Sequence, residues 1–322
     1  MRSRKRTSLV NLGFHAWSIG MVFVSGVVLV PLYLRHIPID LYGAWLASGN
    51  VLVWMTLADP GVSLVLQQRV ASAYGAGDHS GLAGGIATGL WITVAISGVI
   101  ILCGVVSSWF LPGWLGLPQM ADQQELASAF RWSVVGSALM IVSFSVTSVN
   151  QGLQSSAGIG AIYVVASLFR LGAVIALLER GFGLLAIAMP TLGMGLLLLG
   201  GNVVYLRHRL QHERIPFGWA PIHFKELAGL LSWTSIGRMA GVTANHVDLF
   251  VVARVLGPES VGLLRFTRTA PDMGRLLVER PIAALQPSLA HLLGAAGPVS
   301  ARLVVVKVLT AVIYLLVVLA GG

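Results

Sequence analysis

The chain has 322 residues, of which 56% are hydrophobic and 10% are charged, and its mean hydropathy is +0.83. Soluble domains carry roughly 25% charged residues, so this composition excludes an ordinary soluble protein and indicates a polytopic membrane protein. A net charge of +9 would favour nucleic acid as the partner of a soluble protein, but here it is assigned to loops and membrane helices, and no nucleic-acid partner is expected. The single Cys103 excludes an internal disulfide and a zinc site, and we interpret it as a small buried hydrophobic residue.

Apolar segments long enough to cross about 30 Å of hydrocarbon follow one another along the chain. The nine predicted transmembrane helices cover residues 9–34, 41–67, 83–111, 130–150, 159–178, 184–206, 228–253, 260–289 and 303–320. The basic start resembles a signal peptide, but no clear cleavage site follows, so an uncleaved first helix is expected. Lysines and arginines in the short loops predict a cytoplasmic N-terminus and place the loop after the third helix, with Asp122 and Glu125, outside.

The chain contains a weak internal repeat. An offset of 219 residues places Tyr42-Gly43 over Val261-Gly262, and the first two helices over the seventh and eighth. Six helices lie between the copies, so the repeat is parallel, with its axis along the membrane normal. We therefore expect an all-α fold in three parts: a six-helix lobe at 1–206, a basic cytoplasmic linker at 207–227, and the first three helices of a second lobe at 228–322. Because that second lobe is incomplete, a truncated chain or a fragment is expected.

The eighth predicted helix carries a stripe of charged residues. Spacings of three and four put five of them on one helical face, namely Arg265, Arg268, Asp272, Arg275 and Glu279. Each charge costs at least about 2.5–3.5 kcal/mol when it faces lipid at mid-membrane, so the stripe must face protein or water. Three interpretations stay open: ion pairs that join helices, an amphipathic helix lying on the membrane, and a cationic transport cavity.

Other predicted helices supply polar residues that could line such a cavity, since intramembrane ionisable residues are functional hypotheses by default. These are His15 in the first helix, Arg170 in the fifth, and Arg238, Asn245 and Asp248 on one face of the seventh. Several arginines suit an anion with multiple charges, because the guanidinium binds phosphate through two nitrogens and stays protonated. Asp248, Asp272 and Glu279 would hold the arginines in place or carry a coupling ion.

Asp59 in the stretch LADPG has two interpretations. It either breaks the second helix ahead of Pro60 and Gly61, or it takes part in gating a cavity. Elsewhere the sequence contains no phosphate-binding loop of the GxxxxGK[ST] type and no GxSxG, HExxH or CxxC motif. An enzyme is therefore not expected, nor is a cofactor or a metal.

Three stretches carry a family resemblance. VPLYLRHIPIDLYGAW (30–45), LADPGVSLVLQQRVASAYG (57–75) and NQGLQSSAG (150–158) resemble bacterial polysaccharide-export flippases, the O-antigen-type members of the multidrug/oligosaccharidyl-lipid/polysaccharide (MOP) superfamily. The resemblance implies a MATE-like arrangement of two six-helix lobes around a central cavity in the bacterial inner membrane. It also implies that an undecaprenyl-diphosphate-linked oligosaccharide moves from the cytoplasmic to the periplasmic leaflet by alternating access.

In that family setting the substrate's diphosphate and acidic sugars would meet Arg170, Arg238, Arg265, Arg268 and Arg275. Polysaccharide polymerases and chain-length proteins are partners that the resemblance implies. Three competing functions are a drug or small-molecule exporter of the same fold, an enzyme acting on lipid-linked sugars, and a non-transporting remnant. The excess of arginine argues against an exporter of cations, which would need an acidic cavity.

Overall fold

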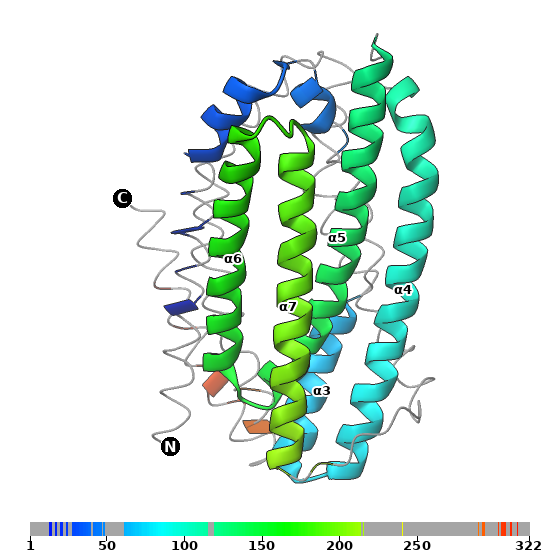
Figure 1. The fold of residues 1–322 in the computed structure, drawn as a ribbon. Helices are drawn as coiled ribbons and strands as arrows, with labels where there is room; N and C mark the ends of the chain where they lie inside the picture. The colour runs from blue at the N-terminus through cyan, green and yellow to red at the C-terminus, as the bar shows by residue number, and fades with distance from the viewer. Residues whose placement is uncertain are drawn as a thin grey trace.

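In the computed structural model, the described residues are 28–39, 41–46, 61–114 and 119–213, with one to three residues at a time elsewhere. Five helices run up and down through them: α3 (Val62–Ala76), α4 (His79–Trp114), α5 (Met120–Gly152), α6 (Ser156–Glu179) and α7 (Leu185–His212). Residues 28–36 and 41–46 are helical as well. Figure 1 shows α4 to α7 as long neighbouring helices, with the shorter α3 packed at one end of the bundle.

Four of these helices are long and apolar enough to cross a membrane, at Gly81–Gly113, Met120–Gly152, Ala157–Glu179 and Leu185–His212. They match the third to sixth predicted helices and confirm an all-α fold with transmembrane helices for this part of the chain. The predicted helices at 228–253, 260–289 and 303–320 lie outside the described residues, apart from a few positions. The two-lobe division and its linker therefore stay predictions.

Two sequence predictions are wrong in detail. Helix α5 starts at Met120, ten residues before its predicted start, so Asp122 and Glu125 lie in its first turns and not in a loop. Cys103, interpreted as buried, is exposed on the surface of α4. Both errors have the same cause. The ends of a membrane helix are polar and its outer face is apolar, so the polarity of a residue shows neither where the helix ends nor whether the residue is buried.

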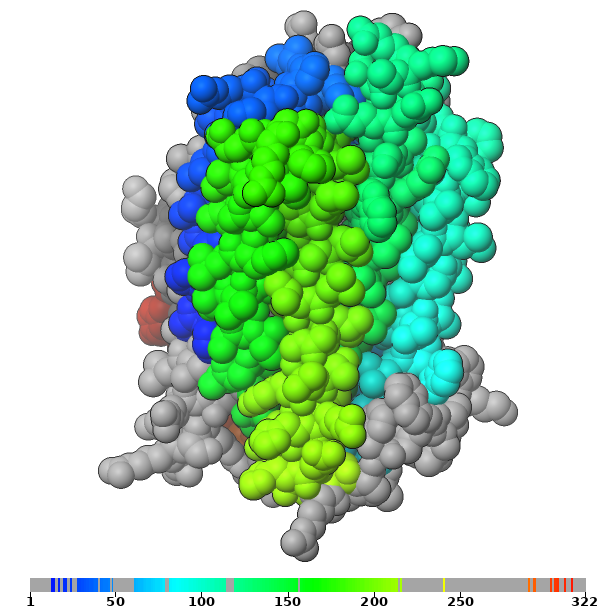
Figure 2. Space-filling view, in the orientation of Figure 1, coloured from blue at the N-terminus to red at the C-terminus, as the bar shows by residue number. Residues whose placement is uncertain are grey.

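Two apolar clusters hold the bundle together. In the first, Tyr33, Ile37 and Leu41 from the N-terminal segment are buried against Leu178 near the end of α6 and Leu184 before α7. In Figure 2 this segment, in dark blue, covers the adjoining ends of α6 and α7. The second cluster joins α3, α4, α5 and α7 at the other end of the bundle through residues such as Val62, Leu66, Ile86, Val149 and Leu206.

Helices α5 and α7 cross at glycines. A Cβ atom added to Gly136 would lie 2.9 Å from the backbone nitrogen of Leu192, and one added to Gly195 would lie 2.9 Å from the Gly136 carbonyl oxygen. Side chains at these positions would force the two backbones apart. Small residues at such crossings are how membrane helices gain close van der Waals contact, because lipid supplies no hydrophobic drive between helices.

Polar side chains cross-link α3, α4 and α5 inside the bundle. Gln67 donates a hydrogen bond from Nε2 to Oε1 of Gln151 at 2.7 Å. The hydroxyl oxygen of Ser145 lies 2.8 Å from that of Thr93 and 3.4 Å from that of Ser63. These bonds satisfy groups that would otherwise be left without partners in an apolar interior.

Candidate functional site

Arg170 is the predicted site residue that the structure describes. It lies nine residues before the end of α6 at Glu179, so its Cα is about 14 Å from that end, inside the apolar span. The side chain is half-buried, and its Nε is buried with no hydrogen-bond partner among the described residues. A buried donor without an acceptor costs about 1–3 kcal/mol, and more when the group is charged, so an acceptor at this nitrogen would be stabilising.

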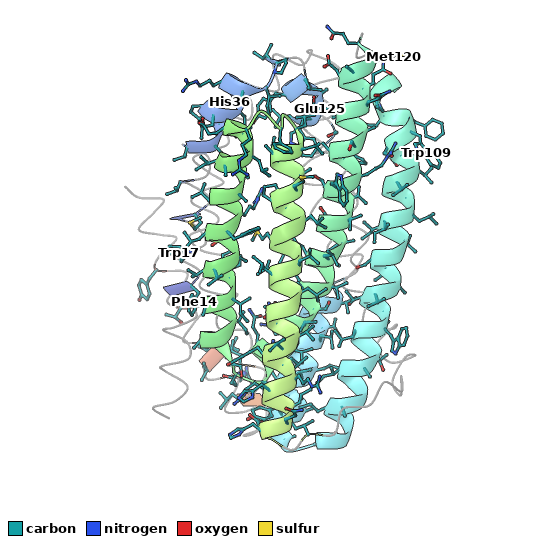
Figure 3. All side chains as sticks on the ribbon, viewed as in Figure 1. Phe14, Trp17, His36, Trp109, Met120 and Glu125 are labelled. Carbon is teal, nitrogen blue, oxygen red and sulfur yellow. The ribbon has the colours of Figure 1, made fainter. Side chains whose placement is uncertain are left out.

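The N-terminal segment borders Arg170. The Arg170 charge acts on the hydroxyl group of Tyr33, and the ring of Tyr33 lies 5.6 Å, centroid to centroid, from the ring of Tyr42. Lower on the same helix, the Trp17 Nε1 donates to the Ser167 hydroxyl at 3.4 Å. The first part of the chain therefore runs along α6, as the labels of Trp17 and His36 in Figure 3 show, and places the Tyr33 phenol within range of the Arg170 charge.

The same segment reaches the end of α6 at His36. Its Nδ1 lies 3.0 Å from the Leu32 carbonyl oxygen, which can only accept a hydrogen bond, so this nitrogen carries a proton. Its Nε2 lies 4.0 Å from Oε1 of the exposed Glu179, which is too long for a hydrogen bond. The apolar cluster around Tyr33 and Leu178 therefore holds this segment beside the helix that carries Arg170.

The other predicted site residues lie outside the described residues, so their positions relative to Arg170 are not given. They are the arginines Arg238, Arg265, Arg268 and Arg275, the acids Asp59, Asp248, Asp272 and Glu279, and the polar residues His15 and Asn245. The cationic stripe of the eighth predicted helix thus stays a prediction.

A second polar group joins the ends of α3 and α7, away from Arg170. Arg209 forms an ion pair with Glu213 and donates from Nη2 to the Leu153 carbonyl at 3.3 Å. Burial, and then the hydrogen bond with Glu213, raises the pKa of Tyr74 above its ordinary value. The arrangement ties three helices together, and we assign it a structural role.

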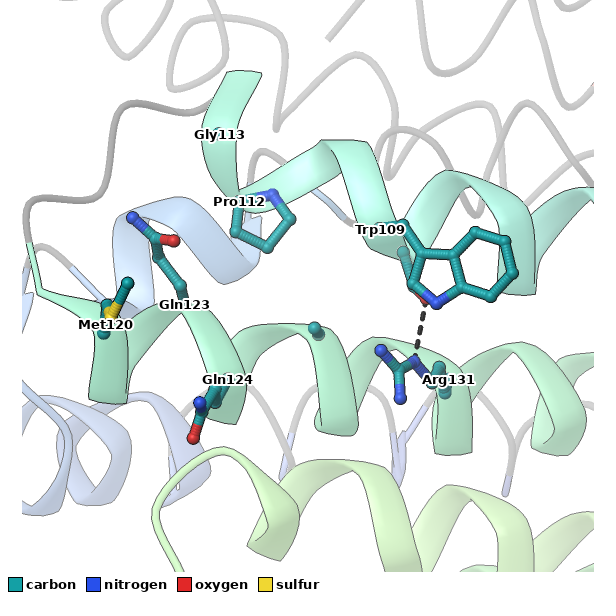
Figure 4. Close-up of a pocket in the computed structure, with 9 residues that line it drawn as sticks. Trp109, Pro112, Gly113, Met120, Gln123, Gln124 and Arg131 are labelled. Atoms are coloured by element: carbon teal, nitrogen blue, oxygen red, sulfur yellow. Dashed lines mark hydrogen bonds between the residues drawn. The ribbon is translucent and has the colours of Figure 1, made fainter.

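Sequence reasoning missed Arg131 in α5. Its Nε donates to the Ser108 hydroxyl of α4 at 2.9 Å, and the side chain borders a cleft of about 460 Å³ between the ends of α4 and α5. Figure 4 shows this bond, with Trp109, Gln124 and Met120 around the cleft. The sequence does show an arginine beside apolar residues. The predicted helix started at residue 130, however, which placed Arg131 at the helix end, where an arginine is ordinary.

No family model and no curated protein matches the sequence. Solved structures do match, and they define the class of fold: the chain has the fold of the transporters of the MOP superfamily. A MATE transporter in the straight conformation has a TM-score of 0.72 at 14% identity, over 99% of this chain and 71% of that one.

Two further solved structures show the same likeness. The outward-facing conformation of a multidrug resistance MATE family transporter has a TM-score of 0.69 at 14% identity, over 97% of this chain and 67% of that one. A MOP superfamily transporter from Pyrococcus furiosus, described as having a binding pocket of reversed polarity that suggests a different function, has a TM-score of 0.69 at 15% identity, over 92% of this chain and 65% of that one. The chain thus spans about two thirds of the length of these transporters, and the likeness concerns the fold alone.

Proposed function

We propose that this protein acts as a transporter that flips a lipid-linked oligosaccharide bearing a diphosphate across the bacterial inner membrane, its N-terminus on the cytoplasmic side. The observation that carries the proposal is the guanidinium of Arg170, which lies at membrane depth and whose buried Nε has no hydrogen-bond partner among the described residues. A diphosphate supplies several anionic oxygens in the geometry that a guanidinium fork binds.

The MOP-like fold supports a transporter, and in the Pyrococcus furiosus protein the reversed polarity of the binding pocket is described as suggesting a different function. A cationic pocket here would favour anions over the cations that an acidic pocket suits. In the proposal, Arg238, Arg265, Arg268 and Arg275 add to the Arg170 charge from the second lobe. Asp248, Asp272 and Glu279 position those arginines or carry a coupling ion.

The test starts from deletion of the intact gene in its host. Lipid-linked repeat units should accumulate on the cytoplasmic leaflet while surface polysaccharide is lost, and the intact gene should restore export. Arg170→Gln should restore export at least about tenfold less well, because a charged hydrogen bond is worth roughly 1.5–3 kcal/mol. Arg170→Lys should lie between, since it keeps the charge and loses the fork.

The matched control is Arg180→Gln, which removes an equal charge from an exposed position at the end of the same helix. It should restore export fully. If the deletion leaves both the lipid-linked pool and the surface polysaccharide unchanged, the flippase proposal is wrong. The likeness to a multidrug resistance transporter then favours an exporter of small molecules, to be tested by drug sensitivity of the same deletion strain.

A further inference from the structure

One face of α4 marks the position of the membrane. Trp91 and Trp109 are exposed by 50% and 65%, and their spacing of 18 residues is five full helical turns, so they lie on the same face about 27 Å apart. The exposed large side chains between them are all aliphatic: Val94, Val99, Leu102 and Val106. Tryptophans prefer the two interfaces of a bilayer whose hydrocarbon core is about 30 Å thick. The level of Trp109 is therefore one lipid–water interface.

Arg131 lies at that same level. Its Nε is bonded to the hydroxyl of Ser108, the neighbour of Trp109, and its side chain is exposed. The described residues give its two terminal nitrogens no acceptor. Trp132, the next residue in α5, is 43% exposed as well. The terminal nitrogens of Arg131, without an acceptor among the described residues, thus lie at the level of the interface that Trp109 marks.

The cleft beside Arg131 is open and lacks negative charge. Its volume is about 460 Å³, and none of its described lining residues is acidic. The nearby Glu125 is engaged elsewhere, where its Oε1 accepts a hydrogen bond from the Leu184 backbone at 2.7 Å. Gln124 lines the cleft and adds an exposed amide group. The cleft therefore offers an anion one positive charge and further hydrogen bonds.

We propose that this cleft binds the phosphate headgroup of a membrane phospholipid. Arg131 holds the phosphate through its terminal nitrogens, and Ser108 fixes the guanidinium at the depth where phospholipid phosphates lie. The acyl chains run down the apolar face of α4 over Val106 and Leu102, which are exposed by 41% and 66%. The site is separate from Arg170 and does not depend on the proposed transport function.

The test measures lipid retention by the full chain in detergent with native mass spectrometry. Phosphatidylglycerol is titrated into the protein, and dioleoylglycerol, which has the same kind of tails without a phosphate, serves as the comparison. The intact protein should retain phosphatidylglycerol and bind dioleoylglycerol at least tenfold more weakly. Arg131→Gln should weaken phosphatidylglycerol binding roughly tenfold or more, while Arg180→Gln, with the same loss of charge, should not change it.

A second variant keeps the test decisive if Arg131→Gln does not fold. Gln124→Glu keeps Arg131 in place but puts an acid in the cleft, and it should weaken phosphatidylglycerol binding and leave dioleoylglycerol binding unchanged. Phosphatidylglycerol binding to Arg131→Gln within twofold of the intact protein overturns the proposal. Equal binding of both lipids also overturns it, as does displacement of phosphatidylglycerol by equimolar inorganic phosphate, which would make this a site for the free anion.

Discussion

The crossing of α5 and α7 at Gly136 gives the sharpest test of the packing. In Gly136→Ala the new Cβ would lie 2.9 Å from the Leu192 nitrogen and 3.0 Å from its Cα, whereas ordinary contacts are 3.4–4 Å. Both are backbone atoms, so they cannot rotate away, and the helices must separate. Overpacking of this kind costs about 1–3 kcal/mol. Against this cost, replacing a glycine inside a helix by alanine stabilises the helix by about 0.5–1 kcal/mol.

A control separates these two effects. Gly98→Ala adds a Cβ that meets nothing within 4 Å on α4, so it should show the helix gain alone. The difference between the two variants in free energy of unfolding is then the overpacking cost, about 1–3 kcal/mol. Reversible unfolding in mixed micelles of increasing sodium dodecyl sulfate, followed by circular dichroism, measures both. Equal stability of Gly136→Ala and Gly98→Ala, within about 0.5 kcal/mol, would show that the crossing is not tight.

Three further changes probe single contacts. Glu125→Ala removes the acceptor of the Leu184 amide and should lower stability by about 1.5–3 kcal/mol, with faster hydrogen exchange at that amide; unchanged exchange would contradict the bond. Gln67→Leu should cost about 1–3 kcal/mol because it leaves Oε1 of the half-buried Gln151 unpaired, and adding Gln151→Leu should recover part of that loss in a double-mutant cycle. The pKa of Tyr74 is raised in the folded state, so the folded protein holds this proton more tightly than the unfolded chain does. The resulting stabilisation is complete below pH 10, the ordinary pKa of tyrosine being near 10, and it falls as the pH rises above that value. Tyr74→Phe should flatten the loss of stability above pH 10, and an unchanged slope would exclude this contribution.

The middle of the fold was predictable because its helices are apolar for longer than a bilayer is thick. The runs that became α4, α6 and α7 needed no tertiary information to be recognised. The start of α5 was not predictable in this way, since Asp122 and Glu125 look like loop residues. They are helical because α5 extends beyond the apolar layer, where Leu126 packs into the first apolar cluster and Glu125 binds the turn before α7.

The candidate site was predictable only in part. Arg170 was selected because a charge within an apolar helix is costly and therefore informative. Its neighbour Tyr33 was not selected, because a tyrosine among apolar residues carries no such signal and lies 137 residues away in the chain. Arg131 was missed because its meaning comes from its level beside Trp109, which requires α4 and α5 to be placed side by side.

The short helix α3 has a consequence for synthesis of the protein. With 15 residues it is about 22 Å long, and it includes Arg69 as well as Gln67, so it is too short and too polar to remain in lipid alone. The partner of Gln67 is made 84 residues later. At 5–20 residues per second the ribosome needs about 4–17 s to reach it. During that interval α3 must wait in the translocon or at the membrane surface, and a chain that stops before Gln151 should be degraded.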